Sequence, residues 1–128
     1  MAKRLLIDTD VLIDYLRGQA EAVSYLESLT GPLLISAITV AELFAGVREG
    51  TERVALEQFV SAFNVIPIDD AIAANGGLIR RDYRKSHGVG LADAIIASTA
   101  EFTKADLVTL NKKHFPMLSN VVTPYHKS

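Results

Sequence analysis

Short apolar runs with the character of β-strands alternate along this chain with segments of helical spacing. Five such runs cover residues 4–7, 33–35, 64–68, 107–110 and 121–123. They lack a clean alternation of apolar and polar residues, which is typical of strands buried on both faces. Between them, helical character is found in residues 11–16, 20–29, 39–47, 52–63, 70–85 and 92–102. This alternation predicts an α/β fold with a mostly parallel sheet.

The composition is that of one globular domain without cysteine. At 128 residues with 49% hydrophobic content, the chain can bury one core, so we expect a single domain over residues 1–128. No segment approaches the roughly 18 apolar residues of a membrane span, and the apolar run before Asp8 is too short for a signal peptide. The absence of cysteine excludes disulfides, thiolate metal sites and cysteine nucleophiles. It also agrees with a reducing compartment, and we expect a cytoplasmic protein.

Four polar residues are the strongest candidates for a functional site: Asp8, Glu42, Asp93 and Asn111. Asp8 ends the first apolar run, whereas Glu42 and Asn111 follow the second and fourth runs. Asp93 stands near the start of a helical segment and can point the same way. Ligands of open parallel sheets bind beyond the carboxyl ends of the strands, so we expect these side chains to converge there. Carboxylates near a core need a partner that offsets desolvation, and a divalent metal suited to phosphodiester chemistry is such a partner.

Each acid also has a purely structural interpretation. Asp8 or Asp10 is a good N-cap for the first helix. The segment from Thr39 to Glu42 matches a capping box, in which the Glu42 carboxylate would reach back to the Thr39 amide. Asp93 near a helix start is favoured by the helix macrodipole. Three such acids among apolar neighbours favour a shared, buried site over three independent caps.

The basic residues are unevenly distributed although the formal net charge is only −2. Residues 80–87 contain a basic run, and Lys112, Lys113 and His114 follow Asn111. Such runs are commonly solvated helix or loop faces. A basic rim beside an acidic pocket would equally suit a polyanionic substrate, and the run 80–85 is our candidate for contact with a nucleic-acid backbone.

Four motifs contain the candidate residues: segments 6–13, 35–43, 91–97 and 107–115. In this order and at these separations, the chain resembles PIN-domain ribonucleases, and specifically VapC toxins of toxin–antitoxin pairs. The resemblance covers essentially the whole chain. It implies a three-layer α/β/α fold around about five mostly parallel strands, a homodimer, and endonucleolytic cleavage of RNA that depends on Mg²⁺ or Mn²⁺.

The resemblance also assigns roles to the four candidates. It implies that Asp8 and Asp93 bind the metal directly, that Glu42 binds it directly or through water, and that Asn111 completes the catalytic set. The family often has Asp at the last position, so Asn111 lowers the charge of the site by one and we expect one metal ion at rest. Without metal, the crowded acids should have raised pKa values.

A VapB-like antitoxin is the partner that the resemblance implies. Such partners lay an apolar helix on the toxin and place a basic side chain in the acidic pocket, and residues 11–16 and 39–63 offer apolar surface for this. Core packing and homodimer contacts are the alternative use of these segments. Two other functions remain open: a PIN module that binds RNA or a partner without cleavage, and a PIN nuclease of RNA processing outside any toxin pair.

Overall fold

A computed structural model describes residues 3–126 and contains a five-stranded sheet in the order β3-β2-β1-β4-β5. The strands are β1 (Leu5–Ile7), β2 (Leu33–Ser36), β3 (Asn64–Ile66), β4 (Asp106–Val108) and β5 (Val121–Val122). All four pairings between neighbouring strands are parallel. The prediction of a mostly parallel sheet is therefore confirmed, and this sheet is parallel throughout.

Six α-helices connect the strands, and each corresponds to a predicted helical segment. They are α1 (Thr9–Leu16), α2 (Ala20–Ser28), α3 (Ala37–Ala45), α4 (Thr51–Val60), α5 (Asp70–His87) and α6 (Leu91–Thr103). A short 3₁₀ helix, η1 (Lys112–His114), follows β4. None of the helices within residues 3–126 is long and apolar enough to cross a membrane.

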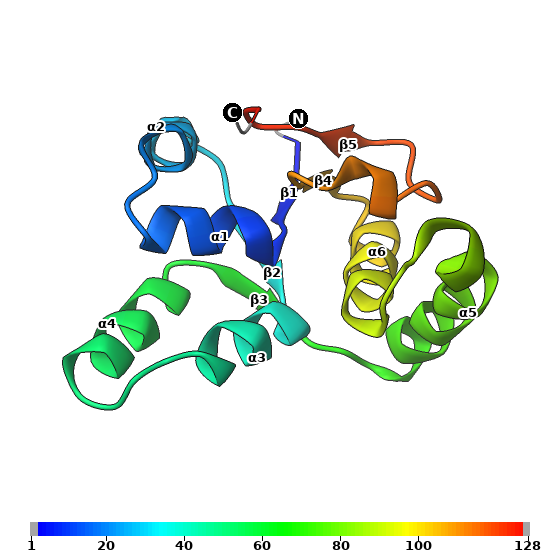
Figure 1. Cartoon of the computed structure of the whole chain (residues 1–128), viewed down its shortest axis with the longest axis horizontal. Coiled ribbons are helices and arrows are strands. Elements are labelled where there is room, and N and C mark those ends of the chain that lie inside the picture. The colour runs from blue at the N-terminus through cyan, green and yellow to red at the C-terminus, as the bar shows by residue number, and fades with distance from the viewer. Residues whose placement is uncertain (1–2, 127–128) are drawn as a thin grey trace.

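The sheet separates two apolar cores, because successive strand residues point to opposite faces. Leu6 packs with residues of α5 and α6, whereas its neighbour Ile7 packs with residues of α1 to α4. The same division holds in the adjacent strands for Leu34 and Ile35 and for Leu107 and Val108. Figure 1 shows α1 to α4 on one side of the sheet and α5 and α6 on the other. This confirms the three-layer α/β/α architecture.

Close packing of α5 against α6 depends on Gly76. A Cβ atom at this position would lie 2.7 Å from Ile95 Cδ1 and 3.4 Å from Ile95 Cα. The missing side chain therefore allows the two helices to approach each other. Because Asp93 lies in the first turn of α6, this packing also fixes where Asp93 stands relative to the sheet.

The order of the strands creates a switch point between β1 and β4. The chain proceeds from β1 to β2 and β3 on one side, and then returns to place β4 on the other side of β1. Connections that leave neighbouring strands in opposite directions open a crevice at their carboxyl ends, where ligands bind in this class of sheet. Asp8 directly follows β1 and Thr109 directly follows β4. The fold thus puts the first predicted site residue at that crevice.

Candidate active site

Asp8 joins β1 to α1 and is nearly completely buried, with 5% of its surface exposed. It is the N-cap of α1, and its Oδ1 accepts a hydrogen bond from the Thr9 amide at 2.8 Å. Its Oδ2 accepts a hydrogen bond from the Thr109 hydroxyl at 2.7 Å. The structural interpretation of Asp8 as a helix cap is confirmed. The same contacts hold its carboxylate at the switch point of the sheet.

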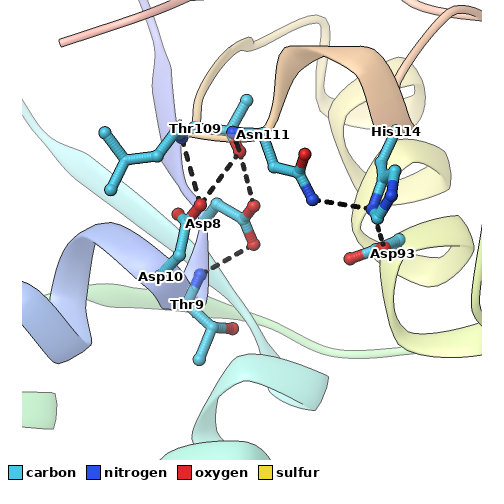
Figure 2. A network of polar contacts seen from close by, with 8 residues as sticks. Asp8, Thr9, Asp10, Asp93, Thr109, Asn111 and His114 are labelled. Atoms are coloured by element: carbon cyan, nitrogen blue, oxygen red, sulfur yellow. Dashed lines mark hydrogen bonds and ion pairs between the residues drawn. The ribbon is translucent and has the colours of Figure 1, made fainter. Parts of the chain in front are cut away.

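A second carboxylate, that of Asp10, lies beside Asp8, as Figure 2 shows. Asp10 Oδ2 accepts from the Leu110 amide at 3.1 Å and lies 3.4 Å from the Thr109 hydroxyl. Its Oδ1 is buried and has no hydrogen-bond partner within the part of the chain that the structure describes. Buried polar atoms are rarely left in this state. Our sequence interpretation considered Asp10 only as a cap.

Burial dominates the electrostatics of this acidic pair. The pKa of Asp8 is raised from 3.8 to about 7, first by burial and then by the charge of Asp10. Hydrogen bonds from Thr109 and Thr9 act in the opposite direction, and the charge of Asp93 adds a smaller increase. Burial also raises the pKa of Asp10, against the hydrogen bond from the Leu110 amide. Among the acids for which a raised pKa was predicted, Asp8 agrees with the prediction, whereas Asp10 was not part of it.

Glu42 lies on α3 and is connected to the acidic pair through Thr9. The Thr9 hydroxyl donates to Glu42 Oε1 at 2.7 Å and lies 3.0 Å from Thr39 Oγ1. The capping-box interpretation is wrong, because α3 begins directly after β2 and Ser36 is its N-cap, accepting from the Ile38 amide. Thr39 is instead a buried residue inside the helix. Glu42 is exposed, so the expectation that all three acids are buried is also corrected.

Asp93 and Asn111 meet at one ring nitrogen of His114. Asp93, the third residue of α6, has its Oδ2 3.2 Å from His114 Nδ1, and Asn111 Nδ2 lies 2.7 Å from the same atom. The backbone N–H of Asn111 donates to Thr109 Oγ1 at 3.0 Å, which connects this group to the acidic pair. Figure 2 shows the two groups side by side at the end of β4. The sequence did not predict that His114 lies between Asp93 and Asn111.

The structure thus brings the four predicted residues to one edge of the sheet in three hydrogen-bonded groups. It does not close them around a single point: within residues 3–126, no three Asp, Glu or His side chains are placed to hold one metal ion. The donors nevertheless suit a hard divalent cation, because they are carboxylate, amide and hydroxyl oxygens. The unpartnered Asp10 Oδ1 and the raised pKa of Asp8 both indicate uncompensated negative potential.

Comparison with known proteins adds a consistent set of similarities. Residues 5–118 match the family model of the PIN domain. The chain is 42% identical over 124 residues to Ribonuclease VapC19 of Mycobacterium tuberculosis, covering 94% of this chain and 98% of that protein. Identity to Ribonuclease VapC10 of the same organism is 41% over 124 residues, covering 94% and 92%. A chain in the solved structure of a toxin-antitoxin complex from Klebsiella pneumoniae has a TM-score of 0.83 and 34% identity, covering 96% of this chain and 99% of that chain.

Proposed function

This chain belongs to the PIN-domain family as a VapC ribonuclease of the toxin–antitoxin type, and we propose that it hydrolyses RNA with Mg²⁺ or Mn²⁺ at its acidic edge. The observation that carries the metal proposal is the pair formed by Asp8 and Asp10. These two buried carboxylates share Thr109 as a neighbour, and one of their oxygens has no partner in residues 3–126. Such a cluster of negative charge is strongly stabilised by a divalent cation.

Asp8, Glu42 and Asp93 are the residues that would hold the ion, and Asp10 is a fourth acid within reach of Asp8. A divalent ion in this position supplies positive charge to the scissile phosphate and lowers the pKa of water. Asn111 offers a neutral amide oxygen where a fourth carboxylate would add charge. We therefore keep the expectation of a single ion at rest.

The chain's own residues aim the carboxylates. Hydrogen bonds from Thr9 and Thr109 fix both oxygens of Asp8, so the carboxylate can accept a further ligand from only a few directions. The Thr9 hydroxyl fixes Glu42, the exposed acid among the three, and so leaves it in contact with solvent. We assign to Glu42 the orientation of the attacking water and the acceptance of its proton. No Ser, Cys or His nucleophile is required, because water attacks phosphorus directly.

Substitution of Asp8 tests this assignment. We expect Asp8→Asn to reduce RNA cleavage by at least about a hundredfold and to abolish growth arrest on expression, because it removes a metal ligand. Asp70→Asn is the matched control, since it makes the same chemical change at an exposed position in the first turn of α5. Cleavage by Asp8→Asn at the wild-type rate would remove Asp8 from the mechanism. If Asp8→Asn stays toxic, and both it and the wild type bind RNA without cleaving it, a non-catalytic PIN module is favoured.

A groove between α1, α3 and α4 is the surface that we assign to a VapB-like antitoxin. Its volume is about 500 Å³, and its apolar lining residues are Ile13, Leu16, Leu43, Val47, Ala55 and Leu56. Glu42 lines the same groove and also contacts Thr9. An apolar helix seated here would bring a basic side chain directly to the acidic site. An antitoxin bound in this groove would therefore also block the acidic site.

Leu16 provides the test of this docking surface, because it is 46% exposed and lines the groove. We expect Leu16→Glu to prevent neutralisation by the protein of an adjacent short reading frame, while RNA cleavage stays unchanged. Phe102→Glu is the control, since Phe102 is 52% exposed on α6, outside the groove. Full neutralisation of Leu16→Glu, or loss of neutralisation only in Phe102→Glu, would place the antitoxin elsewhere. The readout is growth on co-expression, together with co-purification.

A further inference from the structure

One face of α5 carries three arginines around a groove that the acidic site does not include. Arg80, Arg81 and Arg84 lie on the same side of the helix as Gly77, because they are three, four and seven residues further along. These residues and Leu91 of α6 line a groove of about 340 Å³. All five are exposed. The groove is therefore an open, strongly cationic surface.

The positive charge of this groove is poorly compensated. Arg81 Nε pairs with Asp82 Oδ1 at 2.9 Å. Within residues 3–126, neither Arg80 nor Arg84 forms an ion pair. The helix macrodipole accounts for cations in the last turn of α5, where Arg84 lies, but its effect falls off before the turn that holds Arg80. A partner with negative charge would pair with Arg80 and Arg84.

Leu91 connects this cationic groove to α6, the helix that also carries Asp93. It is the first residue of α6, and Asp93 follows two residues later in the same helical turn. Leu91 is 58% exposed, so its apolar side chain is accessible to a partner. The groove thus offers apolar surface and cationic surface within one turn of a predicted metal ligand.

We propose that the groove between α5 and the start of α6 binds single-stranded RNA next to the scissile bond. The inference rests on the proposed ribonuclease function and names the surface that positions its substrate. Arg80 and Arg84 donate to phosphate oxygens, for which the planar guanidinium group is well suited. The exposed side chain of Leu91 contacts a ribose or the face of a base. Phosphate contacts carry no sequence information, so this surface orients the strand and does not choose the cleavage sequence.

Charge favours RNA over a second copy of the chain as the occupant. In a symmetric dimer, the same patch on both subunits meets at the two-fold axis. Contact through this groove would then bring arginines of one subunit against arginines of the other, which is unfavourable. A polyanion meets no such repulsion. RNA is therefore the occupant that the groove's charge fits.

Binding measured without cleavage tests the proposal separately from the ribonuclease mechanism. The parent protein carries Asp8→Asn, and the probe is a short fluorescein-labelled oligouridylate followed by fluorescence anisotropy over a salt series with Mg²⁺ present. The test variant adds Arg80→Gln and Arg84→Gln. The control variant instead adds Arg48→Gln and Arg53→Gln, which remove the same charge from exposed positions near α4.

We expect the test variant to bind about tenfold more weakly or worse, because two charge-assisted hydrogen bonds are lost. The slope of log affinity against log salt should decrease by about 0.7 for each lost phosphate contact. The control should match the parent in both quantities. Leu91→Ala should weaken binding with the slope unchanged, since no charge is removed.

Equal affinity and equal slope in the test and control variants would overturn the proposal, and so would a parent that does not bind the probe. A test variant that loses an oligomeric state held by the parent and the control, measured by light scattering, would make this face a contact between copies and also overturn it. If the wild-type protein fails to cleave RNA while loss of Arg80 and Arg84 still weakens binding, the proposed catalytic function is wrong. The proposal that this groove binds RNA is then still supported.

Discussion

One carboxylate, that of Asp8, is both a helix cap and a member of the candidate site. Its N-cap hydrogen bond uses one oxygen, and the bond from Thr109 uses the other. Both bonds favour the ionised form, yet burial and the charge of Asp10 outweigh them and raise the pKa of Asp8 to about 7. The metal-free protein therefore stores unfavourable charge at this position.

That raised pKa predicts a pH dependence of stability. The folded-state pKa of about 7 lies above the ordinary value of 3.8, so the folded state binds the proton more tightly than the unfolded state. The contribution of Asp8 to the free energy of unfolding of the metal-free protein should thus be greatest at low pH. It should fall as pH rises from about 4 to 7. The loss is at most about 4 kcal/mol, at about 1.36 kcal/mol per pH unit.

Thermal unfolding in EDTA across this pH range, for wild type and Asp8→Asn, checks the dependence. The amide does not ionise, so Asp8→Asn should show a flatter profile and should be the more stable protein at pH 7. Parallel profiles for the two proteins would mean that Asp8 does not carry the unfavourable charge. Added Mg²⁺ should raise the unfolding temperature of the wild type more than that of Asp8→Asn.

Thr9 is predicted to act through Glu42. Thr9→Val removes the hydroxyl that donates to Glu42 Oε1, so we expect cleavage to fall by about tenfold to a hundredfold, as for other residues that orient metal ligands. The effect on the free energy of unfolding should be only about 1 kcal/mol. Thr9→Ser keeps the hydroxyl and should restore most of the activity. Wild-type kcat in Thr9→Val would show that Glu42 needs no such support.

The sequence singled out four candidate positions, but it did not predict the contacts that surround them. Thr109 and Asp8 are hydrogen-bonded although 101 residues separate them, and no local pattern encodes such a pair. His114 was missed for the same reason, because its partner Asp93 lies 21 residues away on another helix. Thr39 was misread because a local capping signature was present, while the helix begins earlier, at Ala37 with Ser36 as its N-cap.

At the scale of elements, hydrophobic patterning was sufficient to locate every predicted strand and helix. The ends observed in the structure differ from the predicted ends by a few residues. The predicted strand 64–68 ends at Ile66, directly before Pro67, which lacks the amide hydrogen that a ladder requires. The helix predicted over 70–85 continues to His87 and ends at Gly88, whose φ of 63° is left-handed. End positions depend on such single residues and on caps, and periodicity does not resolve them.

Two adjacent glycines in α5 give a prediction at this scale. Gly76→Val should destabilise the protein by about 1–3 kcal/mol, because its side chain would overlap Ile95 across the α5–α6 contact. Gly77→Ala should instead stabilise it by about 0.5–1 kcal/mol, since no atom lies within 4 Å of the added Cβ and alanine favours helix. Chemical denaturation of both variants measures the difference. Similar stability of the two variants would mean that α5 and α6 do not pack this closely.

At the scale of the whole molecule, function depends on the order of the strands. The site lies where β1 and β4 become neighbours, and this neighbourhood arises only because the chain crosses back over β1 after β3. Sequence patterning indicated a parallel sheet with polar residues at its carboxyl edge, but it did not specify which strands are adjacent. That adjacency brings Asp10 Oδ2 to the Thr109 hydroxyl and the Leu110 amide at the end of β4.

Cleavage of purified cellular RNA by the purified protein, with its metal controlled, tests the central proposal most directly. Wild-type protein should cut RNA in Mg²⁺, stop in excess EDTA, and resume when Mg²⁺ is restored, because the acids at the edge of the sheet act only through the ion that they hold. Asp8→Asn should not cut under any of these conditions. Undiminished cleavage by the wild type in excess EDTA would contradict a metal-dependent site.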